Sequence, residues 1–211
     1  MSKWEYGGVY KNYNMEGEIN IGGGILKVHN IFDPLPDFMR KADCIFCDPP
    51  CSQANINCFY TKADRTDYQT SYDPFENRFF ECIEEIKPDT LFVEVFAQNA
   101  PNFTERCSDM YSNMHVYDTT YYHKKSCKCF IIACSNRIDV HNLPFDGMDE
   151  EDVIAWIGKN IDYKCIGDLC MGRGLVGWHS YINGKPFVGT ELNKKRLAVL
   201  VDKISKSKAF L

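Results

Sequence analysis

Short apolar runs separated by polar segments recur along the 211-residue chain. Seven of these runs have the length and composition of β-strands, and several are apolar at consecutive positions, as buried strands of parallel sheets are. Their expected ranges are 25–29, 43–47, 90–96, 114–122, 127–134, 163–168 and 186–191. Residues 1–24 are rich in aromatic residues and glycine, and we expect them to form an N-terminal arm or irregular lead-in.

Helical patterns fill most of the gaps between these runs. Residues 73–86 begin with Asp-Pro and are followed by another proline, which favours a helix with proline in its first turn. Asp149 is expected to cap a second helix, and a third is expected to start near Asn193. Residues 52–72 are expected to form a loop.

The order of these elements predicts the fold class. Alternating strands and helices favour right-handed crossovers and a mostly parallel sheet with helices on both faces. The runs 114–122 and 127–134 lie too close together for a crossover, so they must form an antiparallel hairpin. We therefore expect a single α/β domain over residues 25–211, with a seven-stranded sheet.

Composition and charge narrow the class of protein. Hydrophobic residues make up 45% and charged residues 25% of the chain, as in ordinary globular proteins. The formal net charge of −5 is unlike that of a strongly basic nucleic-acid binder, although a local basic patch can still contact phosphates. No apolar run approaches the ~20 residues that span a bilayer, and the start lacks a secretory signal. We expect a cytoplasmic protein that is not bound to a membrane.

Eleven cysteines raise the question of disulfides or metal. Cys44 and Cys47 form a C-x-x-C pair, but both fall within the predicted strand 43–47. Residues three apart on a strand point to opposite faces, which is wrong for chelating one ion. We expect free cysteines that pack as small apolar side chains, and no metal site.

A glycine-rich segment lies between the predicted strand 163–168 and a helix expected after it. Gly172, Gly174 and Gly177 match the spacing G-x-G-x-x-G, in which glycines let the backbone approach a nucleotide closely. The next strand ends at Glu191, where a carboxylate can accept hydrogen bonds from ribose hydroxyls. The pattern predicts a nucleotide-type cofactor site; a tight turn that only packs the helix is the alternative.

Asp48-Pro49-Pro50-Cys51 follows the predicted strand 43–47 directly. The carboxyl ends of parallel strands form the ligand crevice of such sheets, so Asp48 is expected to point into it. Prolines lack an N–H, which leaves carbonyl acceptors in the local backbone. A carboxylate beside a carbonyl can hold the hydrogens of a base amino group and direct its lone pair toward an electrophilic methyl group. An ordinary Pro-Pro loop is the alternative.

The two segments together resemble the DNA amino-methyltransferases that act on adenine N6 or cytosine N4. Asp48-Pro49-Pro50-Cys51 resembles their catalytic motif, (Asp/Asn/Ser)-Pro-Pro-(Tyr/Phe/Trp), and residues 168–174 are similar to their cofactor motif, Asp-Pro-Phe-Met-Gly-Ser-Gly. The catalytic motif comes first, as in the β-type circular order. The resemblance covers about residues 25–208 and implies a Rossmann-like seven-stranded sheet, S-adenosylmethionine as cofactor and nucleic acid, DNA foremost, as substrate.

The resemblance also implies roles for single residues. Asp48 and the Pro49 carbonyl would hold the target amino group, and Pro50 and Cys51 complete the catalytic motif. Glu191 would bind the cofactor ribose. The full set of cofactor-binding residues that it implies is Asp168, Cys170, Met171, Gly172, Gly174, Glu191, Asn193 and Asn30.

Cys51 departs from the family pattern, because an aromatic residue normally stacks there on the extruded target base. A missing stacking face removes roughly 1–3 kcal/mol of base binding. Aromatic residues between positions 52 and 72 could supply it, and packing of a surface lid is their alternative role. The candidates are Phe59 and Tyr60, followed by Tyr68 and Tyr72.

The sequence contains few features that indicate how a target would be recognised. Lys124 and Lys125 lie at the tip of the predicted hairpin and could contact phosphates, with solvated charge as the alternative. Residues 135–148 are too few for an inserted recognition domain. Specificity must then come from short loops or from a second protein chain.

Three functions fit these features. The first is methyl transfer to a base amino group in DNA, with adenine N6 favoured because the motif begins with Asp. The second keeps the chemistry but uses RNA, and the third is a catalytically silent methyltransferase-like subunit or binding module. An NAD-dependent dehydrogenase is disfavoured because Asp-Pro-Pro would have no role in it.

Overall fold

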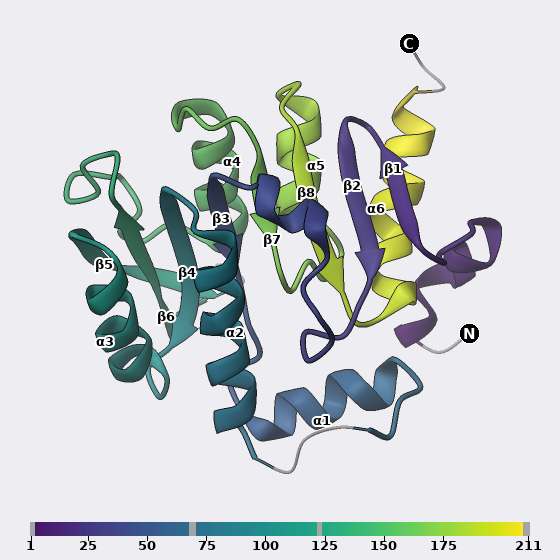
Figure 1. Cartoon of the computed structure of the whole chain (residues 1–211), viewed down its shortest axis with the longest axis horizontal. Coiled ribbons are helices and arrows are strands. Elements are labelled where there is room, and N and C mark those ends of the chain that lie inside the picture. Colours follow the sequence, from purple (N-terminus) through teal and green to yellow (C-terminus); the bar gives the residue numbers. More distant parts are fainter. Residues whose placement is uncertain (1–2, 68–70, 122–123, 209–211) are drawn as a thin grey trace.

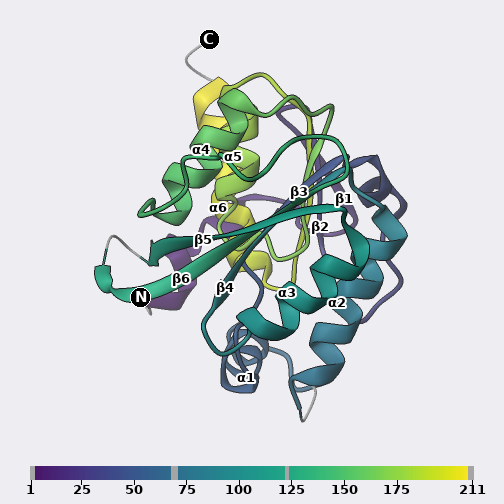
Figure 2. The ribbon, with the colours of Figure 1, turned by 90° about the vertical axis from the view of Figure 1, so that its left-hand side faces the viewer.

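The computed structural model describes residues 3–67, 71–121 and 124–208, without the side chains of residues 3, 4, 124–128 and 208. A twisted sheet of eight strands runs through its centre, with helices on both faces (Figures 1 and 2). This arrangement confirms the predicted mixed α/β class with a mostly parallel sheet.

The sheet has the strand order β1-β2-β8-β7-β3-β4-β6-β5. The five neighbours from β2 to β4 pair in parallel, while β1 pairs with β2, β6 with β4, and β5 with β6 in antiparallel fashion. The hairpin predicted from the short connection is therefore confirmed as β5–β6. The strands are β1 Glu18–Ile21, β2 Gly24–Val28, β3 Cys44–Cys47, β4 Thr90–Phe96, β5 Asn113–Tyr121, β6 Lys124–Ser135, β7 Ile166–Asp168 and β8 Phe187–Glu191.

The sheet has eight strands, one more than the seven predicted, and the additional strand is β1. It lies within the segment expected to be irregular, and it forms one edge of the sheet beside β2. Gly22 and Gly23 connect the two strands with φ of 59° and 81°, the left-handed conformation that two-residue hairpin turns require. Edge strands expose alternate residues, so this one lacks the continuous apolar run of the central strands.

Two layers of helices cover the sheet (Figure 2). Helices α2 and α3 lie on one face, and α4, α5 and α6 lie on the other (Figures 1 and 2). Two 3-10 segments precede β1 and β3. The bounds are η1 Lys3–Asn12, η2 Asp37–Lys41, α1 Gln53–Lys62, α2 Asp73–Ile86, α3 Ala100–Met110, α4 Glu150–Asn160, α5 Leu175–Ile182 and α6 Lys194–Lys208.

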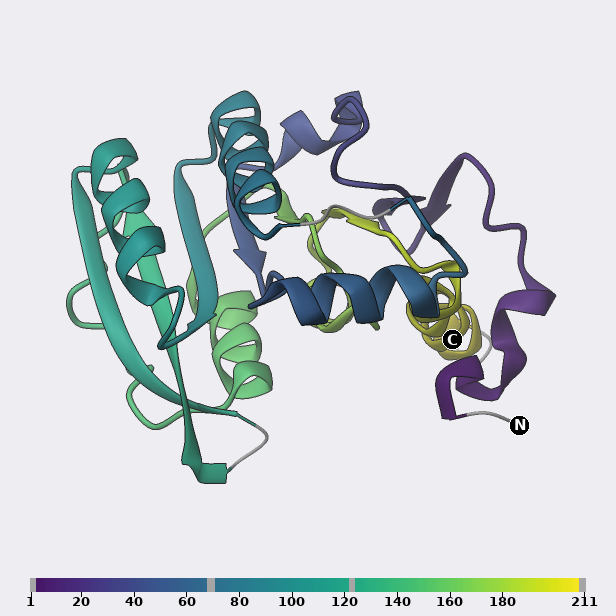
Figure 3. The same cartoon turned by 90° about the horizontal axis from the view of Figure 1, so that it is seen from below.

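Helix α1 replaces the loop expected over residues 52–72. Ser52 caps it, since its Oγ accepts a hydrogen bond from the Asn55 N–H at 3.3 Å. Ile56 and Tyr60, four residues apart, are its buried side chains. Most of its other residues are polar, so its apolar stripe is too short for hydrophobic periodicity to reveal the helix. The helix runs across the edge of the sheet where the parallel strands end (Figures 1 and 3).

The strands alternate between two hydrophobic cores, one under each helical layer. Cys47 packs in the core beneath α2 and α3, whereas Cys44 packs in the core beneath α4, α5 and α6. The C-x-x-C pair therefore points to opposite faces, as expected, and cannot hold one metal ion. The ten described cysteines are all free thiols. Within the described residues, no helix has the length and apolar character that crossing a membrane demands.

Candidate active site

Three acidic residues gather at the carboxyl edge of the parallel strands. Asp48 follows β3 directly, Asp168 ends β7, and Glu191 ends β8. Strand β7 lies between β3 and β8, so the two motifs found in the sequence meet at neighbouring strand ends. The ligand crevice of an open α/β sheet lies at this edge, and here α1 runs across it (Figure 3).

Asp48 occupies an electrostatically unfavourable position for a carboxylate. Burial, followed by the negative charge of Asp168, raises its pKa to about 7, although Arg196 on α6 opposes both effects. The side chain nevertheless keeps partial exposure at the edge of the sheet. A carboxyl group with a pKa near neutrality can accept and release a proton under physiological conditions.

The residues that follow Asp48 are fixed by hydrogen bonds to three other segments. Tyr72 donates its hydroxyl to the Pro50 carbonyl at 2.8 Å, and Gln98 donates to the Cys51 carbonyl. The Cys51 thiol donates to Asn55 Oδ1 at 2.7 Å, at the start of α1. The motif is therefore a rigid turn, and the aromatic ring of Tyr72 lies beside it. Tyr72 is one of the four aromatic candidates, and its hydroxyl bonds directly to the motif.

The glycine-rich turn after β7 has the backbone conformation that its sequence predicts. Gly172 and Gly174 have φ of 55° and 83°, where glycine is favoured. A Cβ at Gly174 would lie 2.6 Å from Leu200 on α6, so a side chain there would push α5 and α6 apart. Asp168 Oδ1 accepts the Cys170 N–H at 2.9 Å, and burial raises the Asp168 pKa to about 8.

Glu191 connects this turn to the start of α6. One carboxylate oxygen accepts the Gly172 N–H at 2.6 Å, and the other accepts the Asn193 N–H at 2.9 Å. Burial raises the Glu191 pKa, while Arg196 and the two backbone donors oppose that shift. Each carboxylate oxygen has two acceptor positions, so Glu191 can still accept hydrogen bonds from a ligand.

Asn193 and Asn30, both assigned to the cofactor site from the sequence, make structural hydrogen bonds. Asn193 Oδ1 accepts the Lys195 N–H at 2.9 Å, which caps α6, and its Nδ2 donates to the carbonyl of Lys62 on α1. Asn30 Oδ1 accepts the Tyr60 hydroxyl at 2.7 Å. Both side chains are buried. The two contacts bring α1 against the ends of β2 and β8.

The proposed substrate-binding residues lie in different surroundings. Tyr60 is buried and donates to Asn30, so its ring forms part of the core. Phe59 is half-buried beside Arg196, with 5.1 Å between the guanidinium carbon and the ring centroid. Lys124 and Lys125 begin strand β6, but their side chains lie outside the described part of the structure, as does Tyr68.

Cys170 and Met171 form the middle of the glycine-rich turn. Cys170 is half-buried, and Met171 is buried with its N–H donated to the Thr190 carbonyl of β8 at 2.9 Å. Met171 also approaches Gly189, where a Cβ would lie 2.5 Å from its sulfur. The turn is thus held against β8 by backbone and side chain together.

Sequence reasoning missed two carboxyl groups next to Asp48. Carboxylate oxygens of Asp48, Glu94 of β4 and Glu150 of α4 all lie within 4.8 Å of one another. Burial, followed by the charge of Asp48, raises the pKa of Glu94 to about 9 and that of Glu150 to about 8. A single acid inside the apolar run Thr-Leu-Phe-Val-Glu-Val-Phe was the signal that could have identified Glu94.

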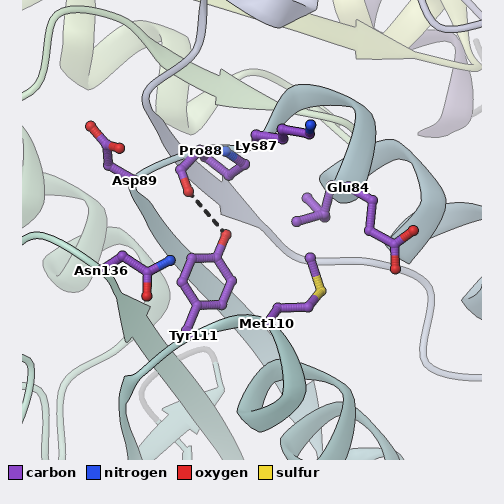
Figure 4. A pocket seen from close by; sticks show the side chains of 8 residues that line it. Glu84, Lys87, Pro88, Asp89, Met110, Tyr111 and Asn136 are labelled. Atoms are coloured by element: carbon purple, nitrogen blue, oxygen red, sulfur yellow. Dashed lines mark hydrogen bonds between the residues drawn. The ribbon is translucent and has the colours of Figure 1, made fainter.

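A separate hollow lies at the opposite end of the sheet. It is lined by Pro88 and Asp89, which precede β4, and by Tyr111, whose hydroxyl donates to the Pro88 carbonyl at 3.2 Å (Figure 4). The amino end of a parallel strand is not where open α/β sheets bind their ligands. We therefore place the candidate active site at the carboxyl edge.

Comparison with known proteins gives similarity in structure but none in sequence. No protein-family model matches the chain, and no curated protein sequence matches it significantly. M1.HpyAVI is 12% identical, with a TM-score of 0.58 over 84% of this chain and 97% of that one. A protein from Thermus thermophilus described as a DNA modification methylase, in complex with S-adenosyl-L-methionine, is 11% identical, with a TM-score of 0.56 over 79% and 86%.

The cytosine-N4-specific PvuII DNA methyltransferase is a third similar structure. It is 8% identical, with a TM-score of 0.55 over 89% of this chain and 90% of that one. At such identities the similarity concerns the course of the backbone alone. The chain has the fold of these DNA methyltransferases, the fold that its motifs predict.

Proposed function

We propose that this chain transfers a methyl group from S-adenosylmethionine to an exocyclic amino group of a nucleic-acid base, with adenine N6 in DNA as the favoured target. The observation that carries the proposal is the meeting of two motifs at adjacent strand ends. Asp48 lies at the end of β3, and Asp168 and the glycine turn lie at the end of β7. The two carboxyl groups are close enough that the negative charge of Asp168 raises the Asp48 pKa.

The residues around the glycine turn suit this cofactor. Gly172 and Gly174 keep the backbone open to a ligand, because neither has a side chain in the turn. The Glu191 carboxylate has acceptor positions for ribose hydroxyls, and Asp168 can pair with the cofactor's ammonium group. The bound cofactor would supply an electrophilic methyl group.

Asp48 would prepare the target nitrogen for attack. Its ionised carboxylate accepts one hydrogen of the base amino group, and the Pro49 carbonyl, next to the Pro50 carbonyl that Tyr72 occupies, can accept the other. These bonds direct the nitrogen lone pair toward the methyl group. Asp48 would also accept the proton that the nitrogen loses when it takes the methyl group from the sulfonium sulfur, which would leave as a thioether.

The choice of DNA follows from the DNA-modifying proteins that share the fold. The choice of adenine rests on the resemblance of the motif, since cytosine-N4 enzymes more often begin it with Ser. PvuII methyltransferase, which has the same fold, is specific for cytosine N4. The fold therefore supports the reaction class more strongly than the identity of the base.

Transfer of labelled methyl from S-adenosylmethionine to DNA and to RNA tests the proposal. We expect label in DNA, located at adenine N6 after digestion to nucleosides. Label in RNA alone would show that RNA is the substrate, and label at cytosine N4 would show that cytosine is the target base. A purified, folded chain that binds S-adenosylmethionine but labels neither polymer would support a silent subunit. A chain that binds NAD and ignores S-adenosylmethionine would overturn the proposal.

Glu191→Gln tests the proposed cofactor site by a binding measurement that does not depend on catalytic activity. Wild type should melt at higher temperature with S-adenosylmethionine, since a ligand of the native state adds RT ln(1 + [L]/Kd) to stability. The variant should show a smaller shift, because the neutral amide is a weaker acceptor and its NH2 would face the Gly172 N–H. Glu84→Gln, on the exposed face of α2, is the control and should keep the full shift.

Tyr72 is the expected source of the stacking face that Cys51 does not provide. Removing an aromatic face costs roughly 1–3 kcal/mol per stacked base, so Tyr72→Ala should weaken substrate binding by about tenfold to a hundredfold. Tyr72→Phe keeps the ring but loses the 2.8 Å hydrogen bond to Pro50, and it should behave much more like wild type. Equal losses in both variants would show that the hydroxyl, by holding the motif, is what matters.

The form of the nucleic acid should also affect the rate. A target base must leave the helical stack before its amino group reaches Asp48, which costs a few kcal/mol. We expect faster single-turnover methylation of single-stranded or mismatched DNA than of matched duplex. In a chain that also carries Tyr72→Ala, Cys51→Tyr should narrow this difference, because it restores a stacking face. Equal wild-type rates on both forms would contradict the prediction.

A further inference from the structure

Three carboxyl groups from separate elements meet beside the glycine turn. Asp48 follows β3, Glu94 lies in β4, and Glu150 begins α4. The β3–β4 register pairs Cys47 with Val93, which places Asp48 and Glu94 at the next position along the two strands. One oxygen from each carboxyl group lies within 4.8 Å of the other two.

Glu94 has a buried oxygen without a partner. Its side chain is 0% exposed, and Oε1 accepts the Cys129 thiol at 3.0 Å. Oε2 is equally buried and has no hydrogen bond to any described residue. Leaving a buried acceptor unsatisfied is energetically costly, and more so if it is charged. A ligand bound beside Glu94 would satisfy this oxygen, which no group of the described residues does.

The local charge is also unbalanced. Among the described residues, no ion pair joins a lysine or arginine to Asp48, Glu94 or Glu150. Arg196 acts on Asp48 and Glu150 only through its field, and the amino end of α4 adds a partial positive charge near Glu150. Together these would compensate for only part of the three negative charges that full ionisation of the cluster places here.

We propose that Asp48, Glu94 and Glu150 bind a divalent cation, Mg²⁺ or Mn²⁺, through one carboxylate oxygen each. Hard cations prefer oxygen ligands, and Mg²⁺ in proteins combines one or two carboxylates with several waters at about 2.0–2.1 Å. An ion between these oxygens would satisfy Glu94 Oε2 and balance the charge. Because Asp48 also belongs to the proposed methyl-transfer site, the ion and the target amino group would compete for it.

Binding of Mn²⁺ to the purified full chain, followed by electron paramagnetic resonance after removal of metals with a chelator, tests the site. We expect a single Mn²⁺ per chain, displaced by Mg²⁺. Glu94→Gln and Glu150→Gln each remove one charged ligand and should weaken binding by about tenfold or more. Asp152→Asn, an exposed acid in the same first turn of α4, is the matched control and should bind as wild type does.

Two results would overturn the site. One is an absence of Mn²⁺ binding to wild type at millimolar concentration, and the other is unchanged binding in both glutamine variants. Glu94→Gln replaces a buried carboxyl group by an amide of the same shape and should remain folded by circular dichroism, while half-buried Glu150 provides a second variant. The measurement uses the free protein, so its outcome is independent of whether the chain methylates nucleic acid.

Discussion

Asp48→Ala should lower the rate of methyl transfer by about a hundred- to a ten-thousandfold, the range for removing a group that takes a proton in the transition state. The variant loses the carboxylate that would hold the target amino group and accept its proton. Binding of S-adenosylmethionine should change little, because the glycine turn and Glu191 lie at the ends of β7 and β8. Single-turnover labelling of DNA and a thermal shift with the cofactor measure the two effects separately.

The stability of this variant gives a further check. Burial raises the Asp48 pKa to about 7, so the ionised side chain does not stabilise the fold, and Asp48→Ala should not melt earlier than wild type at neutral pH. Asp89→Ala, at the opposite end of the neighbouring strand, removes an exposed acid away from the site and should retain full activity. A rate for Asp48→Ala within a few-fold of wild type would remove Asp48 from the mechanism.

The interior of the sheet and its β5 edge could be predicted from the sequence, whereas its β1 edge could not. Strands β3 and β4 are buried almost throughout, so they appear as continuous apolar runs with clear limits. Strand β1 borders solvent and alternates between exposed and half-buried residues, a pattern too short to distinguish from an irregular segment. Its Gly22-Gly23 turn was the stronger signal, because both glycines need positive φ in such a hairpin.

The candidate site could be predicted only where its residues lie next to a strand end in a known motif. Asp48, Asp168 and Glu191 meet that condition, and all three lie at the carboxyl edge. Glu94 and Glu150 join them through β-sheet register and helix packing, which connect residues far apart in the chain. From the sequence alone, Glu150 is one of several acids at a helix start, where the helix dipole explains it sufficiently.

The roles of Tyr72 and Tyr60 likewise could not be predicted from the sequence. From the sequence, both are candidates for stacking on a base, and Tyr60 is the first choice of the two. The structure separates them, because Tyr60 donates to Asn30 inside the core and Tyr72 donates to the Pro50 carbonyl in the motif. The difference arises from the path of the chain after α1, which no local pattern encodes.

The rate of methyl transfer should rise with pH and level off above about pH 7. Asp48 can accept a hydrogen from the target amino group only as a carboxylate, and burial raises its pKa to about 7. Below that pH the ionised fraction falls about tenfold per unit, so the rate at about pH 5 should be about a hundredfold below the plateau. Single-turnover rates at saturating cofactor and DNA, in buffer with a chelator of divalent cations, measure this profile.

Unfolding of the chain would not explain a fall in the rate of methyl transfer toward low pH. The pKa values of Asp48 and Asp168 are raised in the folded chain, to about 7 and about 8. For such groups the folded state binds more protons than the unfolded state, so their contribution to stability is present at low pH and is lost as pH rises through these values. Circular dichroism should therefore show a folded chain at about pH 5, where transfer is slow. A rate that stays constant between about pH 5 and about pH 8 would mean that no group with a pKa near 7 accepts the proton.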